Sequence, residues 1–159
     1  MKQFLTLKDL PNLDDAVIDS IELKKNPFQF EALGKKKTLG MLFFNPSLRT
    51  RLSTQKAAHY LGIHNMIMNF SNEAWALEFD DGTQMSGLRS EHIKEAAAVV
   101  SQYCDIIAIR AFASLNDKES DEAEKVLQNF AKYASIPVVN MESATAHPLQ
   151  ALADAITIK

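Results

Sequence analysis

Hydroxyl and guanidinium side chains directly follow an apolar run in the first third of the chain. The run spans residues 38–44, and after Asn45 and Pro46 the sequence reads Ser-Leu-Arg-Thr-Arg at 47–51. A helix that begins here leaves its first N–H groups unpaired and carries partial positive charge at that end. Amides, hydroxyls and a bidentate Arg can then hold a phosphate together. This stretch therefore predicts an anion site.

A purely structural explanation of the same residues is also open. Ser47 is a good helix N-cap, and Arg49 and Arg51 would then be ordinary solvated residues of the first turn. Cations are mildly unfavourable at a helix N-terminus, so two of them within one turn weakly favour a bound anion over that explanation.

Two further polar segments are expected at the same edge of the molecule. Arg110 follows the apolar run 104–109, and His-Pro-Leu-Gln at 147–150 comes after the run 136–141. Parallel sheets bind ligands at the carboxyl ends of their strands, which is also where Ser47 is expected. We therefore predict that these segments surround one site. A surface Arg paired with an acid, and a His that makes only a structural hydrogen bond, are the alternatives.

The apolar pattern predicts an α/β fold with a doubly wound, four-stranded parallel sheet and helices on both faces. The continuous apolar run at 38–44 is typical of a parallel strand that is covered on both faces. Further strands are expected at 64–70, which has Met66, Ile67 and Met68 at its centre, at 104–109 and at 136–141. The segments between them carry the period of amphipathic helices, so each strand-helix-strand unit should cross over right-handed. Residues 1–12 are expected to be a lead-in.

Helix bounds are predicted from caps and periods. Helices are expected at 14–25, at about 48–61, at 90–103 with Ser90 as N-cap, at 120–134 with Ser120 as N-cap, and from Pro148 onward. Residues 71–89 form a long polar loop that holds the only tryptophan, Trp75. Long loops in compact domains are often functional, although the residue type alone slightly favours packing of Trp75 under its own loop.

The composition is that of a soluble globular domain. The chain has 159 residues, of which 47% are hydrophobic and 23% charged, so it can bury a real core. With 17 Lys and Arg against 20 Asp and Glu the net charge is -3, which argues against a nucleic-acid or membrane surface. A single cysteine, Cys104, and the lack of a signal peptide or an apolar run of ~20 residues lead us to expect a cytoplasmic protein.

Missing motifs disfavour several other classes of function. No strand is followed by G-x-G-x-x-G or by G-x-x-x-x-G-K-[ST], which disfavours dinucleotide and P-loop nucleotide binding. The four histidines, at 59, 64, 92 and 147, show no close ligand spacing. We therefore expect no metal site and no cofactor.

Two of these segments together resemble the aspartate and ornithine carbamoyltransferase superfamily. The stretch 47–51 is similar to the Ser-Thr-Arg-Thr-Arg phosphate loop of that family, and 147–150 is similar to its His-Pro-x-Gln motif, which binds the carbamoyl group. They occur in the family's order, and the likeness covers essentially all of the chain. It is greatest to the N-succinylornithine and N-acetylornithine carbamoyltransferases, a branch that Leu48 in place of the usual Thr also fits.

The resemblance implies a reaction in arginine biosynthesis in which the δ-amine of an N-acyl-ornithine attacks carbamoyl phosphate. Arg49 and His147 would be catalytic: Arg49 and Arg110 hold the leaving phosphate, and His147 stabilises the oxyanion. Glu142 would contact the ornithine substrate. The residues implied for carbamoyl phosphate binding are Ser47, Leu48, Arg49, Thr50, Trp75, Arg110, His147, Pro148, Leu149 and Gln150.

The family also implies a larger assembly than this chain. Residues 1–146 would form the carbamoyl phosphate-binding domain and 147–159 the start of an inter-domain helix, so a second, amino-acid-binding domain is expected to be missing and the chain to be inactive alone. A homotrimer is implied, in which the Trp75 loop reaches a neighbour's site. Ser90 stands where the family has Pro for succinyl and Glu for acetyl substrates. Serine does not repel a carboxylate, so we expect N-succinylornithine first and N-acetylornithine next.

Two other functions stay open. One is a non-catalytic module for binding carbamoyl phosphate or another anion, or for oligomerisation. The other is ordinary ornithine carbamoyltransferase activity, against which the Trp75 loop argues. The expected partners are therefore carbamoyl phosphate and an N-acyl-ornithine, and neither nucleic acid nor a membrane.

Overall fold

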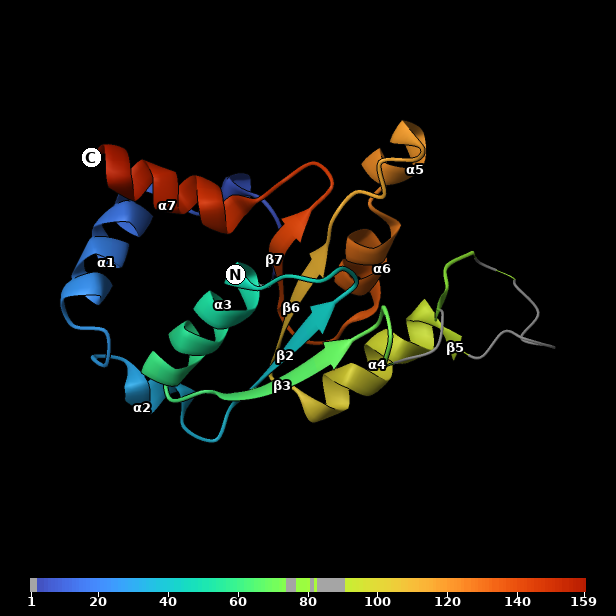
Figure 1. The fold of residues 1–159 in the computed structure, drawn as a ribbon. Coiled ribbons are helices and arrows are strands. Elements are labelled where there is room, and N and C mark those ends of the chain that lie inside the picture. Colours follow the sequence, from blue (N-terminus) through green and yellow to red (C-terminus); the bar gives the residue numbers. More distant parts are fainter. Residues whose placement is uncertain (1–2, 74–76, 81, 83–90) are drawn as a thin grey trace.

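A parallel sheet of five strands forms the centre of the computed structural model, which describes residues 3–73, 77–80, 82 and 91–159 (Figure 1). The strands lie in the order β1-β7-β6-β2-β3, with bounds Gln3–Phe4 (β1), Thr38–Phe43 (β2), His64–Asn69 (β3), Ile106–Ala111 (β6) and Val138–Ser143 (β7). The predicted doubly wound α/β fold is confirmed, with five strands instead of four. The added strand, β1, was missed because two residues are too short to show a period.

Helices cover both faces of this sheet (Figure 1). On one side lie α1 (Leu13–Lys25), α3 (Arg49–Tyr60) and α7 (Pro148–Ile158), and on the other lie α4 (Ile93–Tyr103) and α6 (Lys125–Tyr133). The shorter elements are a 3₁₀ turn at Leu7–Asp9, α2 (Glu31–Gly34) and α5 (Lys118–Glu122). Over the described part of the chain, every helix is too short or too polar to cross a bilayer.

The strand β2 feeds a separate core on each face of the sheet. Its Leu42 packs with residues of α4 and α6, whereas Met41 and Phe43 pack with Ala58 of α3. Successive side chains of a strand point to opposite faces, so a strand covered on both faces needs apolar residues throughout. This requirement is the physical reason for the continuous apolar run of β2.

Two strands end later than their apolar runs suggested. β6 was predicted at 104–109 and β7 at 136–141, but both begin and end two residues further along the chain. Arg110 and Glu142 therefore lie within strands, not beyond them. The apolar run marks where side chains are buried, whereas main-chain pairing continues to the polar residues at the carboxyl edge of the sheet.

A second, small parallel sheet joins the segment predicted as a long loop, 71–89, to the start of the segment predicted as the helix 90–103. It pairs β4 (Leu77–Glu78) with β5 (Glu91–His92). The helix predicted from Ser90 begins at Ile93 instead, because the His92 Nδ1 accepts a hydrogen bond from the Lys94 amide at 3.2 Å and forms the N-cap. Trp75 and Ser90 lie outside the described residues.

The helix predicted at 120–134 is two helices. Asp117, not Ser120, is the N-cap of α5, since its carboxylate accepts a hydrogen bond from the Ser120 amide at 3.1 Å. Between α5 and α6, Glu124 adopts a left-handed backbone conformation with φ 45° and ψ 42°. A helix cannot pass through such a residue, so the amphipathic pattern was correct for α6 but not for its start.

Gly40 in the middle of β2 provides a test of how tightly the core is packed. A Cβ at this position would lie 2.7 Å from the Sγ of the buried Cys104. We expect Gly40→Ala to lower the free energy of unfolding by about 1–3 kcal/mol, the usual cost of overpacking, as measured by urea denaturation. In a Cys104→Ala background, which removes the sulfur, most of that cost should disappear. An equal cost in both backgrounds would contradict this account.

Candidate functional site

The predicted anion loop connects β2 to α3 and opens to the surface. The Arg49 side chain is exposed and Thr50 is half-buried. The N-cap of α3 is Leu48, not Ser47, but the Ser47 Oγ still accepts a hydrogen bond from the Thr50 amide at 3.3 Å. The start of α3 also presents the unpaired amides and partial positive charge of any helix N-terminus. The loop can therefore cap its helix and still meet an anion.

Arg110 is held from two sides at the carboxyl edge of the sheet. Its Nε donates to the Glu142 Oε2 at 2.8 Å, and its Nη1 donates to the carbonyl oxygens of Asn45 at 3.2 Å and Pro46 at 3.0 Å. The Arg110 and Glu142 side chains are only 12% and 20% exposed. These contacts use Nε and Nη1, and a guanidinium also carries N–H donors on Nη2 that can meet an anion.

A β-bulge in β7 places Glu142 opposite Arg110. Ile109 pairs with Asn140, but Arg110 pairs with Glu142, so Met141 is an extra residue in its strand. An extra residue turns the side chains that follow it to the other face of the sheet. Without the bulge Met141 would stand opposite Arg110. This bulge was not predicted, because it leaves no mark on the apolar pattern of the sequence.

His147 begins the helix after β7. It is the N-cap of α7, and its Nδ1 accepts a hydrogen bond from the Gln150 amide at 3.3 Å. Pro148 occupies the first helical position, where a missing N–H is tolerated. Because Nδ1 acts as an acceptor, the neutral imidazole carries its proton on Nε2, which is thereby a donor. The Gln150 side chain donates from Nε2 to the Asp154 Oδ1 at 2.8 Å, which orients its amide.

One cavity of about 1090 Å³ brings the predicted residues together. It is lined by Ser47, Leu48, Arg49, Thr50, Arg110, Glu142, His147, Leu149 and Gln150. Pro148 is buried at the start of α7, and Trp75 lies outside the described residues. Arg49 rather than Arg51 is the cavity-lining cation of its turn. The structure thus gathers at one place segments that are far apart in the sequence.

The cavity continues beyond the polar groups as an apolar groove between α3 and α7. Its walls are Ala57 and Ala58 of α3, Leu61 just after α3, and Leu149 and Ala153 of α7, and its floor includes Leu39, Ile106 and Val139 of the sheet. This groove was not predicted, because each of its residues fits the apolar pattern of its own element.

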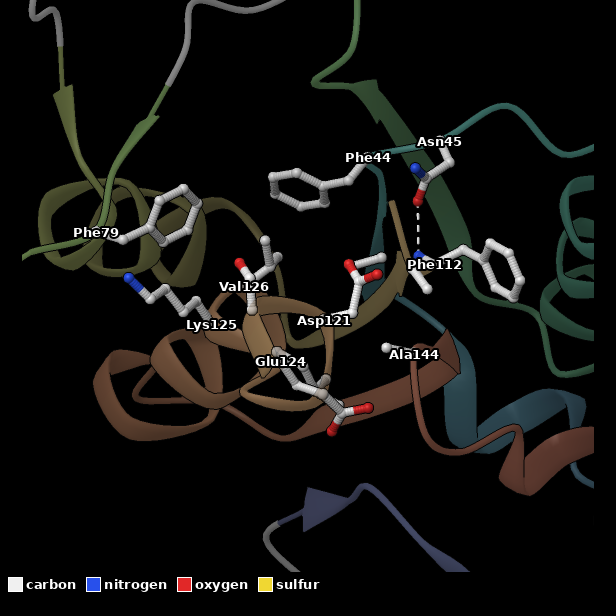
Figure 2. Close-up of a pocket in the computed structure, with 13 residues that line it drawn as sticks. Phe44, Asn45, Phe79, Phe112, Asp121, Glu124, Lys125, Val126 and Ala144 are labelled. Atoms are coloured by element: carbon white, nitrogen blue, oxygen red, sulfur yellow. Dashed lines mark hydrogen bonds between the residues drawn. The ribbon is translucent and has the colours of Figure 1, made fainter. Parts of the chain in front are cut away.

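Sequence analysis also missed the part that Asn45 and Pro46 play. Besides supplying a carbonyl to Arg110, Asn45 accepts a hydrogen bond at its Oδ1 from the Phe112 amide at 2.6 Å (Figure 2). The loop after β2 is therefore fastened to the end of β6. An Asn-Pro pair is a turn signal, and that was the available hint.

The chemistry offered by the cavity is that of an anion site with hydrogen-bond donors. Arg49, Arg110, the start of α3 and His147 line the same cavity. In the ranges that the structure describes, no cluster of three or more His, Cys, Asp or Glu could hold a metal ion. The arrangement can bind a phosphate and donate a hydrogen bond to an oxygen next to it.

Comparison with known proteins gives concordant matches. Residues 2–159 match the family model described as "Aspartate/ornithine carbamoyltransferase, carbamoyl-P binding domain". The N-succinylornithine carbamoyltransferase of Bacteroides thetaiotaomicron is 46% identical over 159 residues, which are 100% of this chain and 50% of that protein. The N-acetylornithine carbamoyltransferase of Xanthomonas campestris pv. campestris is 40% identical over 161 residues, covering 100% of this chain and 47% of that protein.

A solved structure is similar over the same region. It is a crystal structure of an N-acetyl-L-ornithine transcarbamylase mutant, with serine in place of a glutamate, complexed with carbamyl phosphate and N-succinyl-L-norvaline. The TM-score is 0.90 at 39% identity, and the match covers 99% of this chain and 47% of that one. The chain thus spans about half the length of the curated relatives it matches.

The pairing of Arg110 with Glu142 can be measured by a double-mutant cycle. With Arg110→Met and Glu142→Gln, we expect a coupling free energy of about 1.5–3 kcal/mol from urea unfolding, since hydrogen bonds to partly buried charges are among the strong ones. The matched control is the exposed pair Lys118 and Glu122, whose atoms are 3.6 Å apart and which should give at most about 0.5 kcal/mol. Equal coupling in both cycles would contradict the anchoring role of Arg110.

Proposed function

The chain belongs to the aspartate/ornithine carbamoyltransferase family, and from this premise we propose that it acts in the transfer of a carbamoyl group from carbamoyl phosphate to the δ-amine of an N-acyl-ornithine. The observation that carries the proposal is the shared cavity of Arg49, Arg110 and His147. Such a transfer, a step of arginine biosynthesis, needs one place that binds a phosphate and polarises the carbonyl attached to it.

In the proposed complex the phosphate of carbamoyl phosphate lies at the start of α3. Amides of residues 47–50, the hydroxyls of Ser47 and Thr50, Arg49 and the Nη2 of Arg110 would surround its oxygens. The leaving phosphate group gains negative charge as its bond to the carbonyl carbon breaks. Two guanidiniums and the helix end stabilise that charge more in the transition state than in the ground state, which is how they accelerate the reaction.

His147 would act on the carbamoyl oxygen. Its Nδ1 is held as an acceptor by the Gln150 amide, so Nε2–H is the group that can donate to this oxygen. When the δ-amine attacks the carbonyl carbon, a C–N bond forms, the oxygen becomes more negative and its hydrogen bond strengthens. The C–O bond to phosphate then breaks, its electron pair stays on the phosphate oxygen, and the departing phosphate accepts the proton that the amine nitrogen loses. Gln150 would orient the carbamoyl amide.

Because the chain matches about half of each relative, we assign it a part of this reaction. Residues 1–146 would form the carbamoyl phosphate-binding domain, and 147–159, which supply His147 and Gln150 to the same site, would begin the inter-domain helix. Binding without turnover by these residues alone is the second candidate, favoured by the same partial coverage. We also propose a homotrimer in which the Trp75 loop serves a neighbouring site.

For the acyl group we propose succinyl first and acetyl next. The relative at 46% identity is an N-succinylornithine carbamoyltransferase, and the one at 40% is an N-acetylornithine carbamoyltransferase. A glutamate-to-serine mutant of an acetylornithine transcarbamylase was solved with N-succinyl-L-norvaline. Both findings support the expectation drawn from Ser90, since a serine leaves room for a second carboxylate that a glutamate would repel.

Replacement of Arg49 tests the central proposal. We expect Arg49→Ala to abolish saturable binding of carbamoyl phosphate in titration calorimetry while the fold stays intact, because the exposed guanidinium contacts ligand rather than core. The control is Lys56→Ala, which removes a cation further along α3 and should bind as the unmodified chain does. Binding of inorganic phosphate, as a control, and the molecular mass, which gives the oligomeric state, are measured in the same buffer. Unchanged affinity in Arg49→Ala would remove the proposal.

Replacement of Ser90 tests the choice of acyl group. The protein measured is a hybrid in which the remaining half of the N-succinylornithine carbamoyltransferase relative follows this chain, so that the amino-acid-binding part is present. With carbamoyl phosphate bound, Ser90→Glu should weaken binding of N-succinyl-L-norvaline by about tenfold or more relative to N-acetyl-L-norvaline, because the new carboxylate repels the succinyl carboxylate. Ser90→Ala, which adds no charge, should leave the ratio unchanged. Equal losses for both ligands in Ser90→Glu would place Ser90 away from the acyl group.

A further inference from the structure

The break between α5 and α6 places a glutamate where the backbone disfavours it. Glu124 has φ 45° and ψ 42°, a left-handed conformation that costs free energy for any residue with a Cβ and is normally taken by Gly, Asn or Asp. Strained residues of this kind persist when the surrounding contacts hold them, and they cluster at functional sites. The side chain of Glu124 must therefore make contacts that offset the strain.

Those contacts go to the loop between β7 and α7. The Glu124 Oε1 accepts hydrogen bonds from the Thr145 amide and the Thr145 Oγ1, both at 2.9 Å. Burial raises the pKa of the Glu124 carboxyl, but hydrogen bonds from Ser143, Thr145 and Gln128 outweigh it and hold the pKa below its usual value. The carboxylate thus stays charged near neutral pH, which strengthens both hydrogen bonds to Thr145.

The same loop is fastened from its inner side by Asn140. This fully buried side chain donates from Nδ2 to the Ser143 Oγ at 2.9 Å and, at 3.4 Å, to the Ala146 carbonyl. The Ser143 amide also donates to the Ala146 carbonyl, at 2.8 Å. Asn140 and Glu124 therefore hold the segment 143–146 between them, and His147 is the next residue.

Glu124 also lines a second, smaller cavity of about 270 Å³ that Figure 2 shows, together with Ala144 of the loop and Phe44 of the segment after β2. This cavity is lined by a set of residues different from those of the Arg49 cavity. Glu124 thus reaches the loop without taking up space in the proposed binding site.

We propose that Glu124 is a positioning residue for His147: its carboxylate fixes Thr145, and through the segment 144–147 it sets where the His147 imidazole enters the Arg49 cavity. The left-handed backbone at Glu124 is the cost of bringing the carboxylate to Thr145. This role rests on the function proposed for His147 above.

The test separates the carboxylate from the backbone strain. Glu124→Gly removes the carboxylate and relieves the strain, because Gly adopts the left-handed conformation freely. We expect an unfolding midpoint as high as that of the unmodified chain or higher, shifted NMR signals of the His147 ring, and a Kd for carbamoyl phosphate raised about tenfold, the scale of a small misplacement. Glu124→Gln should restore the His147 signals and most of the affinity, since its amide oxygen can still accept from Thr145.

The control is Glu122→Gln, which alters an exposed carboxylate paired with Lys118 and should change neither readout. Wild-type affinity and unchanged His147 signals in Glu124→Gly would overturn the proposal. A lowered unfolding midpoint with no rescue by Glu124→Gln would also overturn it, because the role would then be only structural. If the unmodified chain does not bind carbamoyl phosphate, the proposed function fails, and the His147 signals alone decide the role of Glu124.

Discussion

The ion pair between Arg110 and Glu142 is the contact on which the carboxyl edge of the sheet depends. A guanidinium that is mostly withdrawn from water must be paired, or its burial is costly. Here the pairing joins β6 to β7, and the Nη1 of the same group donates to the carbonyls of Asn45 and Pro46. The position of the loop after β2, and with it the start of α3, is thereby set by Arg110. The Arg110 side chain thus connects β6, β7 and the loop after β2.

Capping and ligand binding are often treated as rival explanations of a polar residue at a helix start, but here they are compatible. The Ser47 Oγ and the His147 Nδ1 each satisfy one amide of the helix that follows. A cap contributes about 1 kcal/mol, and it also fixes the orientation of the capping side chain. For His147 the consequence is chemical, because an occupied Nδ1 leaves Nε2 as the donor.

The fold was largely predictable because both faces of the sheet are covered, which favours apolar residues on both faces of the inner strands β2, β6 and β7. The clustering of residues 47–51, Arg110 and 147–150 followed from their places after such runs, and the family likeness was confirmed. Features that leave no periodic pattern of apolar residues were not predicted. They are the two-residue β1, the true ends of β6 and β7, and the break at Glu124. A glutamate is not a residue type that signals a left-handed turn, so the pattern continued through it.

Because of the bulge at Met141, the place of Glu142 in the site depends on the number of residues in β7 as well as on their types. Met141 itself faces a core and carries no polar group, yet its presence as one additional residue decides to which face Glu142 points. Replacing Met141 by another apolar residue keeps the number of residues in β7, whereas deleting Met141 would turn the Glu142 side chain away from Arg110. Among homologous chains, the length of the strand between Val138 and Ser143 is therefore as informative about the site as the identity of any residue in it.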